Sequence, residues 1–175
     1  PVLLDTDRQV FGDYGIRDLV PHKRFEFIKG DIRNVSDIVE AIKGVDAVIH
    51  LAAIVGDSAC AVTPQRTIET DYLATYNIVE TCKFFQVNRF IFASTCSVYG
   101  ENINSDIQLN EGSPLRPISL YASIKINCEK KILDTADENF SPVIFRMATL
   151  YGYSPSMRFD LVINLLIAKA YFDKK

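Results

Sequence analysis

The sequence predicts an α/β protein built on a doubly wound parallel sheet. Short apolar runs alternate with longer segments of helical periodicity along the 175 residues, an order that favours parallel strands joined by right-handed crossovers. Two of these runs, 46–52 and 89–95, are apolar over most of their length and become small or polar at their carboxyl ends, where open α/β sheets bind ligands. With 48% hydrophobic and 23% charged residues, the composition is that of a globular chain with one core.

Five strands are expected near residues 2–5, 25–29, 46–52, 89–95 and 142–148, and four helices near residues 35–43, 66–86, 119–138 and 157–172. The first helix follows from Ser36 before a periodic run and from Gly44 just beyond it. In the second, apolar residues such as Ile68, Tyr72 and Val79 recur at helical spacing. Residues 101–118, which contain two prolines, and residues 153–158 are predicted to be loops.

Tyr121 and Lys125 form a Y-x-x-x-K pair in the third predicted helix. Positions i and i+4 share a helix face, so the Lys125 ammonium can approach the Tyr121 phenol and favour its ionised form. A tyrosine whose pKa is lowered in this way is a usable general base. With the Thr95 hydroxyl on the same substrate oxygen, the site could take a proton from a sugar or alcohol while hydride passes to a nicotinamide. Taken alone, the pair also fits an exposed amphipathic helix.

Five motifs support a more specific interpretation: residues 30–33 (GDIR), 48–53 (VIHLAA), 94–100 (STCSVYG), 121–125 (YASIK) and 145–152 (FRMATLYG). In their order and approximate spacing they resemble the extended short-chain dehydrogenase/reductase family, in its NAD-dependent epimerase/dehydratase branch. The similarity covers nearly the whole chain. It implies a Rossmann-like fold, NAD as cofactor and a nucleotide-activated sugar as substrate.

The resemblance also implies roles for individual residues. Thr95, Tyr121 and Lys125 match the catalytic triad, and Lys125 would also bond the nicotinamide ribose. The positions that match the cofactor site are Asp5, Asp31, Ile32, Leu51, Ala52, Ala53, Tyr121, Lys125 and Ala148. Asp5 would accept hydrogen bonds from the adenosine ribose and repel a 2′-phosphate, which implies NAD over NADP. Without the other motifs, an ordinary loop carboxylate would be the better interpretation of Asp5.

Six residues are candidates for the substrate side: Val55, Gly56, Asp57, Ser97, Thr149 and Arg158. Arg158 could pair with a diphosphate or be an exposed loop arginine. Cys96 and Ser97 stand where dehydratases of the family carry Asp-Glu, so dehydratase activity is not expected. Epimerases commonly carry Asn where this chain has Asp71 and Thr149, which leaves the sugar contacts open.

The sequence therefore predicts an NAD-dependent epimerase or dehydrogenase of a nucleotide-activated sugar. Residues 113–119 and 149–164 resemble a sub-branch that includes GDP-manno-heptose dehydrogenases. The alternative is a non-catalytic fragment or interaction module of the family that cannot hold the cofactor pyrophosphate.

The family's first strand and glycine-rich turn have no counterpart in the sequence, and Gly12-Asp13-Tyr14-Gly15 is interpreted as an ordinary loop. The chain is thus expected to be truncated at both ends, with residues 1–152 a partial dinucleotide-binding domain and residues 153–175 the start of a substrate-binding domain. Because the missing strand is central in such a sheet, exposed strand edges predict a homo-oligomer and weak NAD binding by the chain itself.

Charge and composition exclude other classes. The net charge of −3 and the lack of a basic cluster argue against a nucleic-acid partner. No apolar run reaches the ~18 residues of a membrane span and no signal pattern is present, so a cytoplasmic protein is expected. The cysteines at 60, 82, 96 and 128 lack C-x-x-C spacing, which indicates reduced thiols and no metal site. Cys96 is expected to fill space, and His50 to be a core histidine bonded to backbone.

Overall fold

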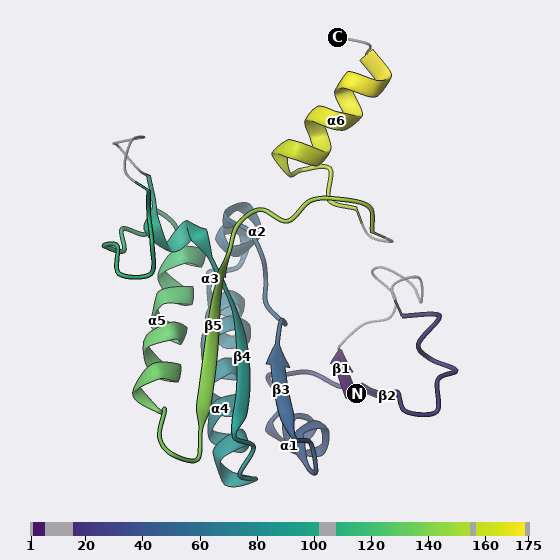
Figure 1. The fold of residues 1–175 in the computed structure, drawn as a ribbon, viewed down its shortest axis with the longest axis vertical. Helices are drawn as coiled ribbons and strands as arrows, with labels where there is room; N and C mark the ends of the chain where they lie inside the picture. The colour runs from purple at the N-terminus through teal and green to yellow at the C-terminus, as the bar shows by residue number, and fades with distance from the viewer. Residues whose placement is uncertain (1, 6–15, 102–107, 155–156, 174–175) are drawn as a thin grey trace.

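The computed structural model describes residues 2–5, 16–101, 108–154 and 157–173 (Figure 1). Strands β1 (Val2–Asp5) and β2 (Glu26–Lys29) form one parallel pair. Strands β3 (Ala47–His50), β4 (Arg89–Thr95) and β5 (Ser141–Met147) form a second parallel sheet in the order β3-β4-β5. All five predicted strands and their parallel arrangement are confirmed. The predicted loop at Gly12 to Gly15 lies outside the described residues.

The helices α1 (Val35–Ile42), α5 (Leu120–Asp134) and α6 (Val162–Asp173) lie where the sequence predicts them. The start of α1 is capped by Asn34, whose side chain accepts a hydrogen bond from the Ser36 N–H at 3.2 Å, so the cap is two residues earlier than Ser36. The start of α5 is capped by Ser119, whose hydroxyl accepts from the Ala122 N–H at 3.2 Å. This cap positions Tyr121 in the first turn of α5.

The helix predicted over residues 66–86 is instead three consecutive segments: α3 (Pro64–Thr67), the π-helix η2 (Ile68–Leu73) and α4 (Ala74–Phe84). Two further segments were not predicted, α2 (Asp57–Val62) and the short 3₁₀ helix η3 (Cys96–Tyr99). A π-turn cannot be recognised from apolar spacing because it changes the number of residues per turn only locally.

The core lies between the three-stranded sheet and the helices α1, α4 and α5. Phe90 and Phe92 of β4 are buried in it together with Val79 of α4 and Ile132 of α5. On the opposite face of the sheet the apolar side chains are exposed: Ile49 by 62%, Val143 by 48% and Phe145 by 53%. One face of this sheet is therefore covered by helices, while the other carries exposed apolar side chains.

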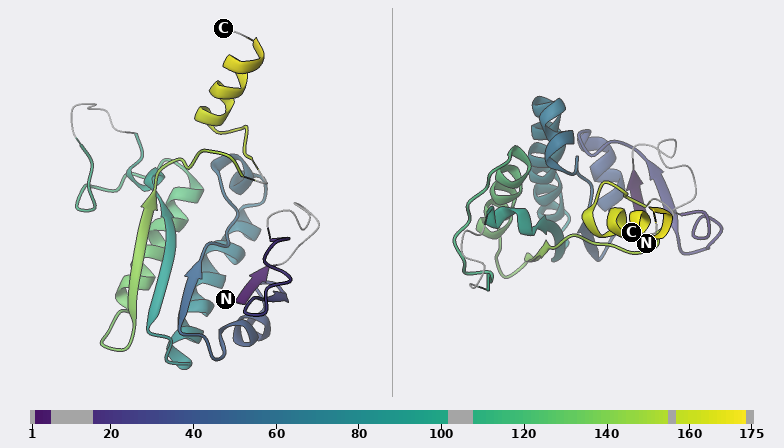
Figure 2. Two further views of the ribbon diagram at one scale, coloured as in Figure 1. Left: turned by 45° about the vertical axis from the view of Figure 1, so that its right-hand side comes forward. Right: turned by 90° about the horizontal axis from the view of Figure 1, so that it is seen from above.

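Figures 1 and 2 show the β1–β2 pair lying apart from β3. Within the described ranges, β1 pairs with β2 and β3 pairs with β4, and no ladder joins β1 to β3. Helix α1 contacts both β1 and α4 and so links the two sheets. Helix α6 projects beyond the carboxyl end of the larger sheet (Figure 1). The predicted division into domains at residue 152 lies between β5 and α6, and it stays a prediction.

Candidate active site

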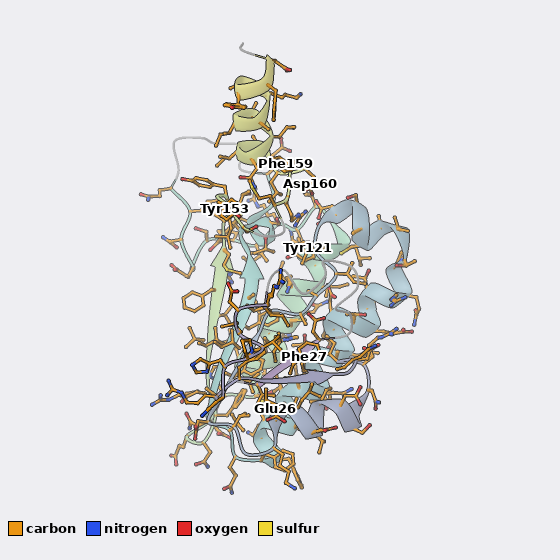
Figure 3. The ribbon with its side chains drawn as sticks, turned by 90° about the vertical axis from the view of Figure 1, so that its right-hand side faces the viewer. Glu26, Phe27, Tyr121, Tyr153, Phe159 and Asp160 are labelled. Atoms are coloured by element: carbon orange, nitrogen blue, oxygen red, sulfur yellow. The ribbon has the colours of Figure 1, made fainter. Side chains whose placement is uncertain are left out.

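A cavity of about 510 Å³ lies at the carboxyl ends of β4 and β5. Residues 55–57, 94–97 and 147–154 line it, together with Tyr121, Arg158, Leu161 and Asn164. In Figure 3, Tyr121 of α5 lies toward the same end of the sheet as the segment that carries Tyr153, Phe159 and Asp160. The parallel strands explain this grouping, because their carboxyl ends, and the loops that follow, meet at one edge of the sheet.

The cavity brings together most of the predicted site. Two of the three predicted catalytic residues, Thr95 and Tyr121, line it, as does Ala148. All six substrate-side candidates also line it: Val55, Gly56, Asp57, Ser97, Thr149 and Arg158. Lys125 is not among the lining residues, and neither are Asp5 at the end of β1 and the predicted cofactor residues that follow β2 and β3.

Tyr121 is 8% exposed, and burial raises the pKa of its phenol to about 12. The Asp71 carboxylate acts in the same direction as burial, and the Arg158 guanidinium acts in the opposite direction. The sequence predicted a lowered pKa from the neighbouring Lys125. That prediction is wrong for this structure, because removal of the phenol from water outweighs the positive charges nearby.

Lys125 follows Tyr121 by about one turn of α5, and its side chain is 4% exposed. Its Nζ donates to the Ala93 carbonyl at 2.8 Å and lies 4.6 Å from the centre of the Phe92 ring, but 5.8 Å from that of Tyr121. Burial lowers the pKa of Lys125, and Asp71 is the strongest of the groups that oppose this shift. The i, i+4 geometry therefore holds, with the ammonium anchored to the end of β4.

Thr95 is the last residue of β4 and the cap of η3. Its hydroxyl donates to the Ser97 hydroxyl at 3.1 Å and accepts from the Ser97 N–H at 3.1 Å. Both residues line the cavity, and Cys96 between them is exposed. The Thr95 hydroxyl can turn its proton toward a ligand oxygen by releasing Ser97.

A buried carboxylate to which the sequence analysis gave no role, that of Asp71, lies in η2. Asp71, in η2, is 2% exposed, and its Oδ1 accepts from the Ile54 N–H at 2.8 Å while its Oδ2 has no partner. Burial raises the pKa of Asp71 to about 6, against the hydrogen bond from Ile54 and the charge of Lys125. The one feature of the sequence that could have singled out Asp71 is that epimerases of the resembled family commonly carry Asn at this position.

His50 is buried as predicted, but its partner is a side chain and not the backbone. Its Nε2 lies 2.9 Å from the Thr75 hydroxyl, which donates to the Asp71 carbonyl at 2.5 Å. Because that hydroxyl has only one proton to donate, the His50 Nε2 must be the donor to Thr75. Burial lowers the pKa of His50 to about 3, so the ring is neutral and belongs to the core.

The outer wall of the cavity depends on Asn164, a residue in α6 with no signal in the sequence. It is 6% exposed, donates from Nδ2 to the Arg158 carbonyl at 3.0 Å and accepts from the Gly152 N–H at 3.3 Å. The Arg158 guanidinium is held by Asp160, with an Nη2–Oδ2 distance of 2.6 Å. An anion that bound Arg158 would therefore compete with Asp160.

The predicted cofactor residues follow the carboxyl ends of β1, β2 and β3. Asp5 ends β1 and is exposed, and Leu51 after β3 is 64% exposed. Asp31 is bonded by Arg33, which lowers its pKa, and lines a second cavity of about 390 Å³; Ile32 is buried in the core. Asp5 and Leu51 are thus accessible to a ligand at these strand ends, whereas the Asp31 carboxylate is engaged by Arg33 and the Ile32 side chain is buried.

None of the helices within the described residues is long and apolar enough to cross a bilayer. In the same part of the chain, no group of three or more His, Cys, Asp or Glu side chains is arranged to hold a metal ion.

Comparison with known proteins places the chain in one family. The sequence model of the NAD dependent epimerase/dehydratase family matches residues 4–174. A protein of Bacillus subtilis named an uncharacterized UDP-glucose epimerase, YtcB, is 34% identical over 155 residues, which are 87% of this chain and 47% of that protein. A dTDP-D-glucose 4,6-dehydratase of Dictyostelium discoideum is 33% identical over 82% of this chain and 36% of its own length.

Among solved structures, the UDP-glucuronic acid 4-epimerase of Bacillus cereus, determined with UDP-glucuronic acid and NAD, superposes with a TM-score of 0.82. It is 29% identical, and the match covers 98% of this chain and 55% of that structure. The chain therefore spans about half, or less, of the length of the two relatives named above, and 55% of this structure. The superposition confirms the Rossmann-like fold.

Proposed function

The chain belongs to the NAD-dependent epimerase/dehydratase family, and from that membership and the cavity at β4 and β5 we propose that it forms the catalytic part of an NAD-dependent epimerase or dehydrogenase of a nucleotide-activated sugar. The observation that carries the proposal is the cavity itself, which Thr95 and Tyr121 line together with all six substrate-side candidates. A sugar hydroxyl placed there can reach both hydroxyl-bearing side chains.

In the proposed reaction the ionised Tyr121 phenol takes the proton of a sugar hydroxyl, and the C–H bond on the same carbon breaks to give the ketone. Bound NAD supplies the hydride acceptor and, in its oxidised form, a cationic ring. Thr95 donates a hydrogen bond to the reacting oxygen after releasing Ser97. Lys125, fixed to the Ala93 carbonyl, keeps a positive charge behind the phenol. In an epimerase, hydride would then return to the opposite face of the ketone carbon, and Tyr121 would return the proton to the oxygen.

A phenol whose pKa is raised to about 12 by burial is a poor base at neutral pH. The proposal therefore requires additional positive charge at the site when the complex forms. The charge of Arg158 already lowers the pKa of Tyr121, and a cationic ring near the phenol would lower it further.

The dehydratase reaction is not proposed, because Cys96 and Ser97 supply neither the acid nor the base for eliminating water. Asp5, Asp31, Ile32 and residues 51–53 are proposed to hold the adenosine side of NAD, and Ala148 the nicotinamide side. The alternative is a non-catalytic fragment or interaction module of the family that cannot hold the cofactor pyrophosphate, which the same experiment distinguishes when NAD binding is measured beside turnover.

The test uses the intact protein and follows NAD reduction, or the exchange between sugar epimers, with a panel of nucleotide sugars. Tyr121→Phe should lower turnover by roughly 10²–10⁴, the range of general acid–base catalysis. Tyr153→Phe is the matched control, because Tyr153 lines the same cavity but is 94% exposed. Near-normal turnover in Tyr121→Phe would contradict the mechanism. Absence of both NAD binding and turnover on any of the sugars would favour the non-catalytic alternative.

A further inference from the structure

Asp71 and Lys125 are two buried charged groups that no ion pair joins. The carboxylate of Asp71 has one oxygen bonded to the Ile54 N–H and the other without a partner. The Lys125 ammonium donates to the neutral Ala93 carbonyl. Within the described part of the chain, Lys125 forms no salt bridge within 4 Å. Their attraction therefore acts through the protein interior, where charges are screened less than in water.

The backbone of η2 fixes Asp71 against the helix that carries the catalytic pair. The Cys128 thiol, three residues after Lys125 in α5, donates to the Asp71 carbonyl at 3.2 Å, and Thr75 donates to the same oxygen. The side chain of Asp71 is bonded to Ile54, immediately before the cavity residues 55–57. Asp71 thus lies between α5 and the loop that forms one wall of the cavity.

We propose that Asp71 is a positioning residue of this site, whose buried and only half-bonded carboxylate, held between α5 and residue Ile54, keeps a negative charge beside the helix that carries Tyr121 and Lys125. A nearby negative charge disfavours a phenolate and favours an ammonium, so one carboxylate acts on both groups in the same direction. Asp71 raises the pKa of each of them. The working pH range of the pair is then set jointly by α5 and by a residue of η2.

Other titratable or charged groups face the same region. They are Tyr121, Lys125, Cys128 and Glu129 of α5, Asp57 and Cys60 of α2, His50 of β3, and Arg158. Asp57 and Cys60 also disfavour ionisation of Tyr121, and Arg158 favours it. Of the acidic residues that raise the pKa of Tyr121, Asp71 has the largest effect, and only burial has a larger one.

The turnover arm of the test rests on the proposed function. In the intact protein, kcat/KM is expected to depend on pH through ionised Tyr121 as base and protonated Lys125. Asp71→Asn should shift both limbs of this profile toward lower pH, by roughly one unit each. Asparagine has nearly the same shape and keeps an oxygen for the Ile54 N–H. A merely structural role would lower the rate without moving both limbs in parallel, and that result would overturn the inference.

A second measurement does not need turnover. Titration of protein labelled with ¹³C at the tyrosine Cζ, with Tyr121→Phe to identify the signal, should give a pKa of Tyr121 that is lower by about one unit in Asp71→Asn. Glu80→Gln removes one carboxylate from α4 at a surface position, where Glu80 pairs with Lys131, and should leave the signal unchanged. A shift in the titration without turnover in the wild type would contradict the proposed function alone. Turnover with an unshifted signal would contradict this inference alone.

The wild type provides a check that needs no variant of Asp71. The Tyr121 Cζ signal should show a small inflection near pH 6 as Asp71 titrates. If Asp71→Asn does not fold, the presence of this inflection supports the inference. A signal that is flat between pH 5 and 7 overturns it.

Discussion

Arg146 of β5 donates three hydrogen bonds to the Glu129 carboxylate of α5. The Arg146 Nε lies 3.1 Å from both carboxylate oxygens, and Nη2 lies 2.7 Å from Oε2. The Ser94 hydroxyl also bonds Oε1, and the Arg146 Nη1 donates to the Tyr99 hydroxyl at 3.1 Å. This cluster ties together α5, which carries Tyr121 and Lys125, and the ends of β4 and β5.

We expect Glu129→Gln to lower the free energy of unfolding by about 3 kcal/mol, because it leaves the partly buried Arg146 guanidinium without its counter-charge. The Glu129 side chain is only 4% exposed and that of Arg146 18%. Urea denaturation measures the change, with an unaltered m-value as the sign that the same two states are compared.

The control for this pair is the double variant Glu129→Leu/Arg146→Met, which replaces both charges by apolar groups. It should be destabilised less than Glu129→Gln, because no charge is left buried and unpaired. A double variant that loses the sum of the two single losses would contradict this account of the pair.

His50 should make the folded protein sensitive to acid. Its pKa in the folded state, about 3, lies below the ordinary value of 6.5, so the unfolded chain binds a proton that the folded protein does not. The stabilisation is fully present above pH 6.5 and is lost as the pH falls toward 3. His50→Gln should reduce the loss over this window by a few kcal/mol.

The measurement is the unfolding free energy at several pH values between 3 and 7. His22→Gln is the matched control, because His22 is the other histidine of the chain and is exposed. An equal loss of stability with pH in the wild type and in His50→Gln would show that another group titrates.

Cys96 should be the first thiol to react with iodoacetamide under native conditions. Cys96 is exposed, whereas Cys60, Cys82 and Cys128 are buried. Burial also raises the pKa of Cys82 to about 12 and that of Cys128 to about 11, which lowers their thiolate fractions further. Peptide mass spectrometry after limited labelling identifies the site.

Turnover by the intact protein should survive Cys96→Ala, since no step of the proposed reaction uses this thiol. A loss of turnover comparable to that of Tyr121→Phe would instead give Cys96 a chemical role. Labelling of Cys60 before Cys96 would contradict the burial pattern.

Cofactor preference should depend on Asp5, which is exposed at the end of β1. A carboxylate there would repel a 2′-phosphate, so the intact protein should bind NAD more tightly than NADP. Asp5→Asn should reduce this preference by about tenfold, equivalent to roughly 1.4 kcal/mol. Calorimetric titration with both nucleotides is the measurement, and Asp18→Asn is a control at another exposed position. An unchanged ratio would mean that Asp5 does not contact the ribose.

The sequence by itself determined the parallel architecture and most of the cavity. Residues 46–52 and 89–95 are apolar runs that end in small or polar residues, and parallel strands present those ends at one edge. Thr95 at the end of β4, Tyr121 in the first turn of α5 and Ala148 after β5 therefore line one cavity, although Thr95 and Ala148 are 53 positions apart in the sequence. The i, i+4 relation of Tyr121 and Lys125 likewise needs only a helix.

The tertiary structure alone decided the electrostatics of the site. The sequence predicts that Lys125 lowers the pKa of Tyr121, yet burial of the phenol and the charge of Asp71 raise it. The pairings of Glu129 with Arg146 and of His50 with Thr75 also join residues with no common local pattern. Desolvation and long-range pairing depend on which distant segments pack together, and a local sequence pattern contains no measure of that packing.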